Sequence, residues 1–231
     1  MRKAFLLLFV AAWAGVAAAS PAPGEFITHG PRKGKRVALT FDDGPGPYTE
    51  RVLEILKRSG VRATFFMNGD QVATRPKLAR KVFEAGHEIG DHTYNHIDFH
   101  TYDREDKADR LRQEMRLSKK AIQKAVGTTP KLCRMPYGFV RPWVREIARH
   151  EGYALVNWTF GNDWHSIEPE AKRRDYLKAI RPGAIFLMHD GGARRQGTLF
   201  VLEGLLEELK RQGYEAVTVG ELLGRHPEES R

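Results

Sequence analysis

Two adjacent carboxylates, Asp42 and Asp43, follow an apolar run and precede the chain-breaking sequence Gly-Pro-Gly-Pro at residues 44–47. The apolar run at residues 36–41 is predicted to be a buried strand, so both carboxylates lie where a strand gives way to a loop. Successive side chains of an extended chain point to opposite faces, and the two carboxylates are therefore expected to do different work. One can bind a metal ion while the other faces a bound water.

His92 and His96 have the i, i+4 spacing that places two imidazoles on one face of a helical turn, close enough to share an ion. Histidine pairs at this spacing also occur on solvated helices, so the pair alone does not establish a site. Adding Asp43 gives a set of three ligands that leaves coordination positions open for water and substrate. An open set of this kind indicates a catalytic metal site.

Short apolar runs alternate with amphipathic stretches along the chain. The runs lie near residues 36–41, 62–66, 87–90, 131–134, 153–158, 184–188 and 214–218. The amphipathic stretches lie near residues 48–59, 75–85, 103–126, 141–151, 168–180 and 198–212. Repeated strand and helix within one domain predicts an α/β fold with a parallel sheet. With about seven such units, a distorted or incomplete (β/α) barrel forming a single catalytic domain is favoured over an open doubly wound sheet.

Polar residues cluster where the predicted strands end. They are Asp42 and Asp43, residues 91–96, residues 134–138, Asp163 with Trp164, and His189 with Asp190. In a barrel of this type the chemistry is at the carboxyl ends of the strands. Five such segments at one rim predict a single active site.

Composition bears on the binding partners and the cellular compartment of the protein. The 231-residue chain has a formal net charge of +9 and a pI near 9.7, which suits solubility near anionic surfaces but selects none of them. Basic residues are scattered without interleaved aromatics, so nucleic acid is not an expected partner. The single cysteine, Cys133, excludes an internal disulfide and fits a bacterial exported protein.

The amino terminus has the layout of a signal peptide. Arg2 and Lys3 precede an apolar segment from Ala4 to about Val16, and small residues follow up to Ala19. The segment is shorter than the ~20 residues of a usual membrane span. We therefore predict export to the periplasm or the extracellular space, with membrane contact only through an uncleaved signal segment.

The domain boundaries follow from these patterns. Residues 1–19 are assigned to the signal peptide and residues 20–35, rich in Pro, Gly and Lys, to a leader or extended arm. The catalytic domain is placed at residues 36–225 and a polar tail at 226–231.

Five segments, taken together and in order, resemble the motifs of the polysaccharide deacetylases. These segments are residues 40–45, 92–96, 134–138, 163–164 and 187–189. The family shares the nodulation-type chitooligosaccharide deacetylase domain, in the fourth carbohydrate esterase class, and the resemblance covers roughly residues 36–220. It implies a distorted (β/α) barrel, a divalent metal, usually zinc or cobalt, and hydrolysis of N-acetyl or O-acetyl groups on polysaccharides. The sequence departs from the pattern at Phe160, where the family often has Asp, and at Cys133, where an aromatic is common.

The resemblance assigns the metal and the base. Asp43, His92 and His96 would be the metal ligands, and Asp42 the general base that deprotonates the attacking water. By similarity Arg134 orients Asp42, and its positive charge is expected to keep that base ionised.

The resemblance also assigns the groups around the leaving group. The backbone N–H of Tyr137 would stabilise the oxyanion, and His189 would be the general acid with Asp163 as its partner. Trp164 and Leu187 resemble the walls of a small pocket for the acetyl methyl group. Each has a structural alternative, since Leu187 could only fill the core and Trp164 could only pack against the rim.

The function expected from these features is metal-dependent deacetylation of N-acetylglucosamine-containing glycans, peptidoglycan or chitin-like oligomers, with release of acetate. Two alternatives stay open. One is O-deacetylation of a polysaccharide such as acetylxylan, and the other is a non-catalytic glycan-binding protein on the same scaffold. The same metal site and His189 would serve an amide or an ester substrate.

Overall fold

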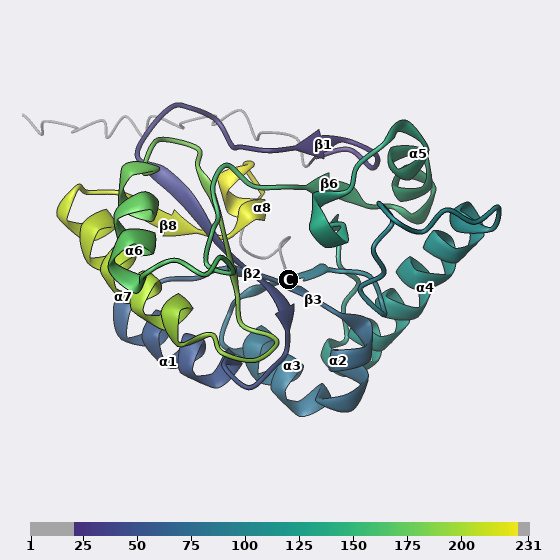
Figure 1. Cartoon of the computed structure of the whole chain (residues 1–231), viewed down its shortest axis with the longest axis horizontal. Helices are drawn as coiled ribbons and strands as arrows, with labels where there is room; N and C mark the ends of the chain where they lie inside the picture. Colours follow the sequence, from purple (N-terminus) through teal and green to yellow (C-terminus); the bar gives the residue numbers. More distant parts are fainter. Residues whose placement is uncertain (1–20, 226–231) are drawn as a thin grey trace, which may run out of the picture.

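Eight parallel strands form one curled sheet in the computed structural model, which describes residues 21–225 (Figure 1). The strands are β1 (Phe26–Ile27), β2 (Arg36–Gly44), β3 (Thr64–Met67), β4 (Glu88–Asp91), β5 (Leu132–Cys133), β6 (Ala154–Val156), β7 (Ile185–His189) and β8 (Glu215–Val217). Their order is β1-β6-β5-β4-β3-β2-β7, and β8 pairs with the first half of β2. The distorted barrel expected from the sequence is confirmed, and every predicted apolar run contains a strand.

Helices cover the outside of the sheet (Figure 1). They are α1 (Thr49–Ser59), α2 (Gly69–Thr74), α3 (Pro76–Glu84), α4 (Lys107–Val126), α5 (Pro142–Glu151), α6 (Pro169–Lys178), α7 (Gln196–Arg211) and α8 (Val219–Leu222), with a 3₁₀ turn, η1, at Pro136–Gly138. The six amphipathic stretches correspond to α1, α3, α4, α5, α6 and α7. The short helices α2 and α8 were not predicted.

The barrel closes through irregular chain instead of a further strand. After β6, the Thr159 N–H donates to the Ile185 carbonyl at 2.8 Å, and the Leu187 N–H donates to the Phe160 carbonyl at 2.9 Å. On its other side, the Thr159 hydroxyl donates to the carbonyl of Thr28, just beyond β1. This segment therefore joins the β1 edge to the β7 edge, which is why the barrel is distorted.

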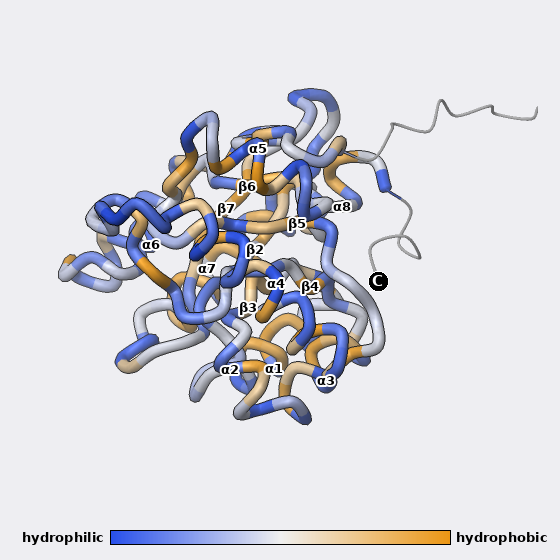
Figure 2. Tube along the Cα trace, turned by 90° about the vertical axis from the view of Figure 1, so that its right-hand side faces the viewer, coloured by the Kyte–Doolittle hydropathy of each residue, from blue (hydrophilic) through white to orange (hydrophobic). Residues whose placement is uncertain are grey.

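Alternation along β2 decides which side chains enter the barrel. Val37, Leu39 and Phe41 pack in a cluster with residues of α1 and α7 on the helix side. Ala38 packs with Ile185 in the barrel interior, so the same alternation directs the later even-numbered residues of β2 inward. Figure 2 shows the central strands as largely hydrophobic and the outer loops as largely hydrophilic. Asp42 is thus a carboxylate at the end of an inward-facing row.

The first strand, β1, lies outside the predicted catalytic domain. β1 lies within the segment that was assigned to an extended arm, and it pairs with β6 through Phe26–Leu155 and Ile27–Val156. The predicted signal peptide and polar tail lie outside the described residues. Between residues 21 and 225 no helix combines the length and the apolarity needed to cross a bilayer.

Helix α2 is fixed directly against the loop that follows β4. The Gly69 N–H donates to the Thr93 carbonyl at 2.9 Å, and the Asp70 N–H donates to the Tyr94 carbonyl at 3.1 Å. A Cβ atom on Gly69 would lie 2.5 Å from the Tyr94 ring and 2.6 Å from the Ser118 backbone. Only glycine allows this approach.

Replacing Gly69 with Ala is therefore expected to lower the free energy of unfolding by about 1–3 kcal/mol, the usual cost of overpacking. Urea denaturation measures the change. The matched control is Gly197→Ala in the first turn of α7, where a Cβ would meet only the Lys172 Nζ at 3.7 Å. That control should cost nothing and can gain up to ~1 kcal/mol from helix propensity. Equal effects of the two substitutions would contradict the close contact between α2 and the loop.

Candidate metal centre and active site

Arg134 and Asp42 form a buried ion pair inside the barrel rim. The Arg134 side chain is fully buried and Asp42 is 2% exposed. Arg134 Nη1 donates to Asp42 Oδ1 at 2.7 Å and to the Thr40 hydroxyl at 2.7 Å. Its other nitrogens donate to the carbonyls of Val156 and Asn157, at 3.0 and 3.2 Å. One guanidinium thus joins β2 to β6 and fixes the orientation of the Asp42 carboxylate.

Asp43 departs from the alternation of the strand. Its φ is 70°, and the β2–β3 register shifts between Asp42 and Gly44, which marks a bulge. As a result Asp43 and Asp42 do not diverge. Asp43 Oδ1 lies 3.5 Å and Asp42 Oδ2 lies 3.8 Å from the same atom, His92 Nε2. The two carboxylates were expected to differ because they would point to opposite faces. They differ instead in their partners, since only Asp42 contacts Arg134.

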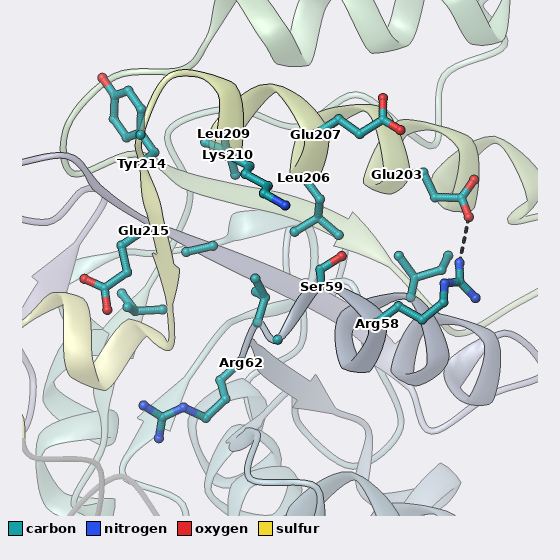
Figure 3. A pocket seen from close by; sticks show the side chains of 16 residues that line it. Arg58, Ser59, Arg62, Glu203, Leu206, Glu207, Leu209, Lys210, Tyr214 and Glu215 are labelled. Carbon is teal, nitrogen blue, oxygen red and sulfur yellow. Dashed lines mark hydrogen bonds and ion pairs between the residues drawn. The ribbon is translucent and has the colours of Figure 1, made fainter.

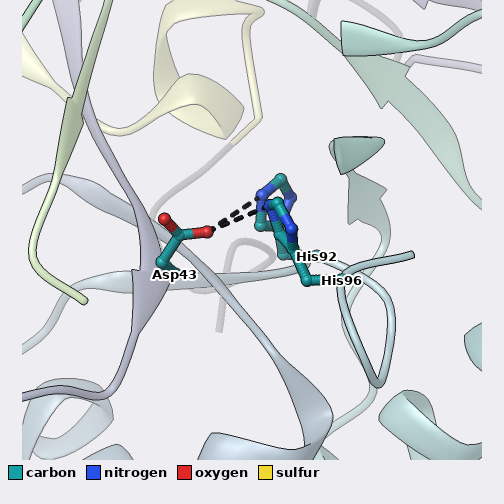
Figure 4. Close-up of side chains that lie close together, drawn as sticks. All are labelled: Asp43, His92 and His96. Atoms are coloured by element: carbon teal, nitrogen blue, oxygen red, sulfur yellow. Dashed lines mark ion pairs between the residues drawn. The ribbon is translucent and has the colours of Figure 1, made fainter. Parts of the chain in front are cut away.

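The two histidines lie on a loop, and the expectation of a helical turn was wrong. Residues 92–96 contain no helix, and both Thr93 and His96 have positive φ, at 64° and 55°. The loop nevertheless brings the rings together, with centroids 5.0 Å apart. Asp43 Oδ1 faces both, at 3.5 Å from His92 Nε2 and 3.3 Å from His96 Nε2 (Figure 4).

Buried carboxylates hold this histidine loop. Glu114 of α4 is fully buried and accepts hydrogen bonds from the N–H groups of Tyr94 and Asn95, at 3.0 and 2.6 Å. Asp91 accepts from the Thr93 N–H at 2.7 Å and from the Tyr153 hydroxyl at 2.6 Å. These bonds stabilise the left-handed backbone of the loop, which has an intrinsic energetic cost.

The geometry of Asp43, His92 and His96 fits a divalent ion. Their ligand atoms all lie within 4.8 Å of one another. A tetrahedral ion bound at 2.0–2.1 Å separates its ligands by roughly 3.3 Å, close to the distances found here. Asp43 Oδ1 is buried and accepts no hydrogen bond from the described residues. His92 Nδ1 donates to the Arg134 carbonyl at 2.6 Å, which leaves Nε2 as the coordinating atom.

The charges around these ligands favour a cation. Burial lowers the pKa of His92, but the carboxylates of Asp42 and Asp43 outweigh burial and raise that pKa above its ordinary value. Burial raises the pKa of Asp43, yet interaction with His92, His189 and His96 brings it below its usual range. A bound divalent ion would take the place of the proton that this environment attracts.

His189 and Asp163 form a second pair at the same rim. His189 is the register partner of Asp42 on the adjacent strand β7. Its Nδ1 lies 2.8 Å from Asp163 Oδ1, and its backbone N–H donates to Asp163 Oδ2 at 2.9 Å. The Thr198 hydroxyl also donates to Asp163 Oδ2, at 2.6 Å. Burial lowers the pKa of His189, but the hydrogen bond and charge of Asp163, with the charges of Asp42 and Asp43, raise it overall.

The remaining predicted residues surround these groups. Tyr137 is in η1 with φ 58° and is 60% exposed, and its ring lies 5.0 Å from that of His96. Its N–H donates to no acceptor among the described residues. Trp164 is 42% exposed and stands edge-on to His189 at 5.3 Å. Leu187 is buried and lies on the inward row of β7, two residues before His189.

Sequence reasoning missed the supporting residues of the site. Asp91 was grouped only with the polar residues 91–96, although its position directly before His92 was a usable signal for a supporting role. Glu114 and Thr198 were not singled out, because charged and hydroxyl residues on helices usually face solvent, and Arg195, in the loop just before α7, was not singled out either. Arg195 Nη2 lies 3.6 Å from Asp43 Oδ2, which places a second cation near the ligand set.

A large cavity of about 990 Å³ lies elsewhere, between α1, α7 and β8, where the strands of the sheet begin (Figure 3). The Arg58–Glu203 ion pair, at 3.0 Å, lies on its wall. None of the predicted site residues lines it. Its volume therefore does not make it the centre of the chemistry.

Comparison with known proteins agrees with this arrangement. The model of the family described as polysaccharide deacetylase matches residues 29–156. A peptidoglycan-N-acetylglucosamine deacetylase from Bacillus cereus is 40% identical over 197 residues, which cover 84% of this chain and 90% of that protein.

Two solved structures share the fold. A peptidoglycan N-acetylglucosamine deacetylase superposes with a TM-score of 0.80 at 27% identity, covering 89% of this chain and 95% of that one. A CE4 family pseudoenzyme from Bacillus anthracis superposes with a TM-score of 0.78 at 31% identity, covering 87% and 69%. The family model and the relative at 40% identity, together with the Asp43–His92–His96 site, make this chain a member of the polysaccharide deacetylase family.

Proposed function

We propose that the protein is an exported, metal-dependent deacetylase that hydrolyses N-acetyl groups of N-acetylglucosamine-containing glycans and releases acetate. The observation that carries the proposal is the presence of three sets of groups at one rim. These are a ligand set at Asp43, a carboxylate oriented by Arg134, and an imidazole oriented by Asp163.

Asp43, His92 and His96 would hold the ion. Two imidazoles and one carboxylate suit zinc, with cobalt as an alternative. When bound, the ion supplies a Lewis acid that polarises the acetyl carbonyl and makes a water more acidic.

Asp42 is proposed to accept a proton from the attacking water. Arg134 occupies its Oδ1, and no described residue hydrogen-bonds to Oδ2, which is therefore available to the water. Asp42 and Asp43 both approach His92, but only Asp42 is bonded to Arg134, which supports different roles for the two carboxylates. Arg134 is proposed as a positioning residue, because it is fully buried and bonded to the proposed base.

The Tyr137 N–H is proposed to stabilise the charge on the acetyl oxygen. The left-handed conformation at Tyr137 withholds that N–H from the protein's own carbonyls. A single preorganised donor of this kind contributes roughly 3–4 kcal/mol to transition-state stabilisation in other enzymes.

His189 is proposed to protonate the leaving amine. Its Nδ1 is occupied by Asp163, which leaves Nε2 to carry the transferred proton. Trp164 stands against the His189 ring, and Leu187 lies beneath it on the same inward row. These two apolar side chains suit a small pocket for the acetyl methyl group.

The glycan and the compartment are proposed from different features. The Bacillus cereus relative acts, by its name, on N-acetylglucosamine of peptidoglycan, and the signal-peptide layout of residues 1–19 supports export to the cell wall. The pseudoenzyme relative makes a non-catalytic glycan-binding role the main competing function. Against that role, this chain retains both the ligand set and the two oriented catalytic pairs.

The proposed function is tested by measuring acetate release from peptidoglycan, acetylated chitooligosaccharides and acetylxylan in parallel. Release from the N-acetylated glycans is expected, with loss on chelation and recovery on adding zinc or cobalt, because the ligand set supplies the ion that activates water. Release from acetylxylan alone would favour the O-deacetylase. If the metal-loaded protein released no acetate from any of the three substrates but still bound glycan, the non-catalytic role would be supported.

The proposed acid predicts a specific change of pH dependence. Asp163→Asn removes the anion that raises the pKa of His189, so that pKa falls and the protonated acid is lost at lower pH. The alkaline limb of the kcat profile should move to lower pH, and kcat at neutral pH should fall by about 10²-fold.

Asp109→Asn is the matched control for this substitution, since Asp109 is an exposed carboxylate on α4. It should leave the profile unchanged. If the alkaline limb of the Asp163→Asn profile were unaltered, His189 would not be the general acid.

A further inference from the structure

A second cavity, of about 490 Å³, adjoins the metal ligands. Asp43 and His96 form one of its sides, and Asn68, Gln71 and Arg75 at α2 form another. Pro47 and residues 192–193 complete the lining. None of the roles proposed above uses the α2 side of this cavity.

Asn68, which lines this cavity, carries an unused acceptor. The residue is 7% exposed, and its N–H donates to the Gly44 carbonyl at 3.0 Å, which fixes its backbone. Its side-chain Oδ1 is buried and has no hydrogen-bond partner among the described residues. A buried unpaired acceptor costs about 1–3 kcal/mol, so a ligand hydroxyl or amide N–H would relieve it.

Arg75 is positioned by two successive side-chain hydrogen bonds, which link it through Gln71 to Asp70. Asp70 Oδ2 accepts from Gln71 Nε2 at 3.0 Å, and this bond directs Gln71 Oε1 to accept from Arg75 Nη1. No described residue accepts from Arg75 Nε or Nη2. The guanidinium is therefore held along one edge while its other donors remain available for a ligand.

The distance from this cavity to the metal ligands is fixed by the backbone. The first turn of α2 is bonded to the carbonyls of Thr93 and Tyr94, inside the histidine loop. Of the residues that the structure describes, Asp43 is the only acidic one that lines the cavity, and Arg195 lies 3.6 Å from its carboxylate. The charge of Asp43 is therefore partly balanced by Arg195, and the nearby Asp70 carboxylate, which does not line the cavity, is bonded to Gln71.

We propose that this cavity binds the sugar next to the one that is deacetylated, and that Arg75 selects a carboxylate carried by that sugar. Asn68 would accept from a hydroxyl or acetamido N–H of the same ring. The inference rests on the proposed function and deepens it, since it names an anionic glycan as the preferred substrate class. A guanidinium edge with two available donors matches a carboxylate.

The test compares Arg75→Gln with wild type on three soluble substrates, by measuring kcat and KM for acetate release. The first is a peptide-free peptidoglycan oligosaccharide, in which alternate sugars carry a free lactyl carboxylate. The second is the same oligosaccharide with stem peptides attached, and the third is neutral chitotetraose. Arg80→Gln is the matched control, because Arg80 is exposed on the neighbouring helix α3 and does not line the cavity.

Arg75→Gln is expected to lower the ratio of kcat/KM for the anionic substrate over chitotetraose by roughly 3- to 10-fold, mainly through KM, as befits one partly solvated charge contact. Arg80→Gln should leave the ratio unchanged. A loss on the peptide-free oligosaccharide would identify the lactyl carboxylate, and a loss on the peptide-bearing one alone would identify a peptide carboxylate.

An equal loss on all three substrates, or no loss on any, would overturn the inference. Asn68→Ala adds an independent measurement, since it should raise KM for every substrate that fills the cavity. If wild type released no acetate from any of the three, the proposed function would fail and not the anion selectivity alone.

Discussion

A single buried guanidinium connects most parts of the site. The side chain of Arg134 binds Asp42 and the carbonyls of Val156 and Asn157 at the end of β6, while its backbone carbonyl accepts from His92 Nδ1. The same residue therefore orients the proposed base and one proposed metal ligand. Removing either member of a buried ion pair leaves an uncompensated charge and typically costs 3–5 kcal/mol. Burying Arg134 in the barrel interior therefore depends on Asp42. The stability of the fold and the orientation of the proposed base thus rest on the same ion pair.

Backbone strain gives the two adjacent carboxylates different partners. An undistorted β2 would send Asp43 away from the barrel interior, but its left-handed conformation turns it toward His92. His96 has the same kind of backbone. Glu114 and Asp91 stabilise the loop between the histidines, so the strain is offset by buried hydrogen bonds. These hydrogen bonds fix the loop conformation within the protein itself, which is the arrangement that preorganised catalysis requires.

Most strands, the long helices and the principal site residues could be predicted from the sequence, because they follow from the periodicity and the order of residues along the chain. Buried parallel strands read as apolar runs, and the carboxyl ends of such strands must share one rim, so the principal site residues could be placed together. The loop conformation at Thr93 and His96 could not be predicted, because positive φ is uncommon in non-glycine residues and even the enrichment of His there is only a weak local signal. β1 has two residues, too few for a periodic pattern. Glu114 resembles any charged helical residue until the fold buries it against the loop.

The most direct test of this account is a crystal structure of the zinc-loaded protein, with anomalous diffraction measured at the zinc edge. One peak is expected about 2.0–2.2 Å from the Asp43 carboxylate and from Nε2 of His92 and His96. Asp42 should remain bonded to Arg134 and should not coordinate the ion. Coordination by Asp42 in place of Asp43, or zinc bound only elsewhere, would contradict the assignment of one carboxylate to the metal and the other to the water.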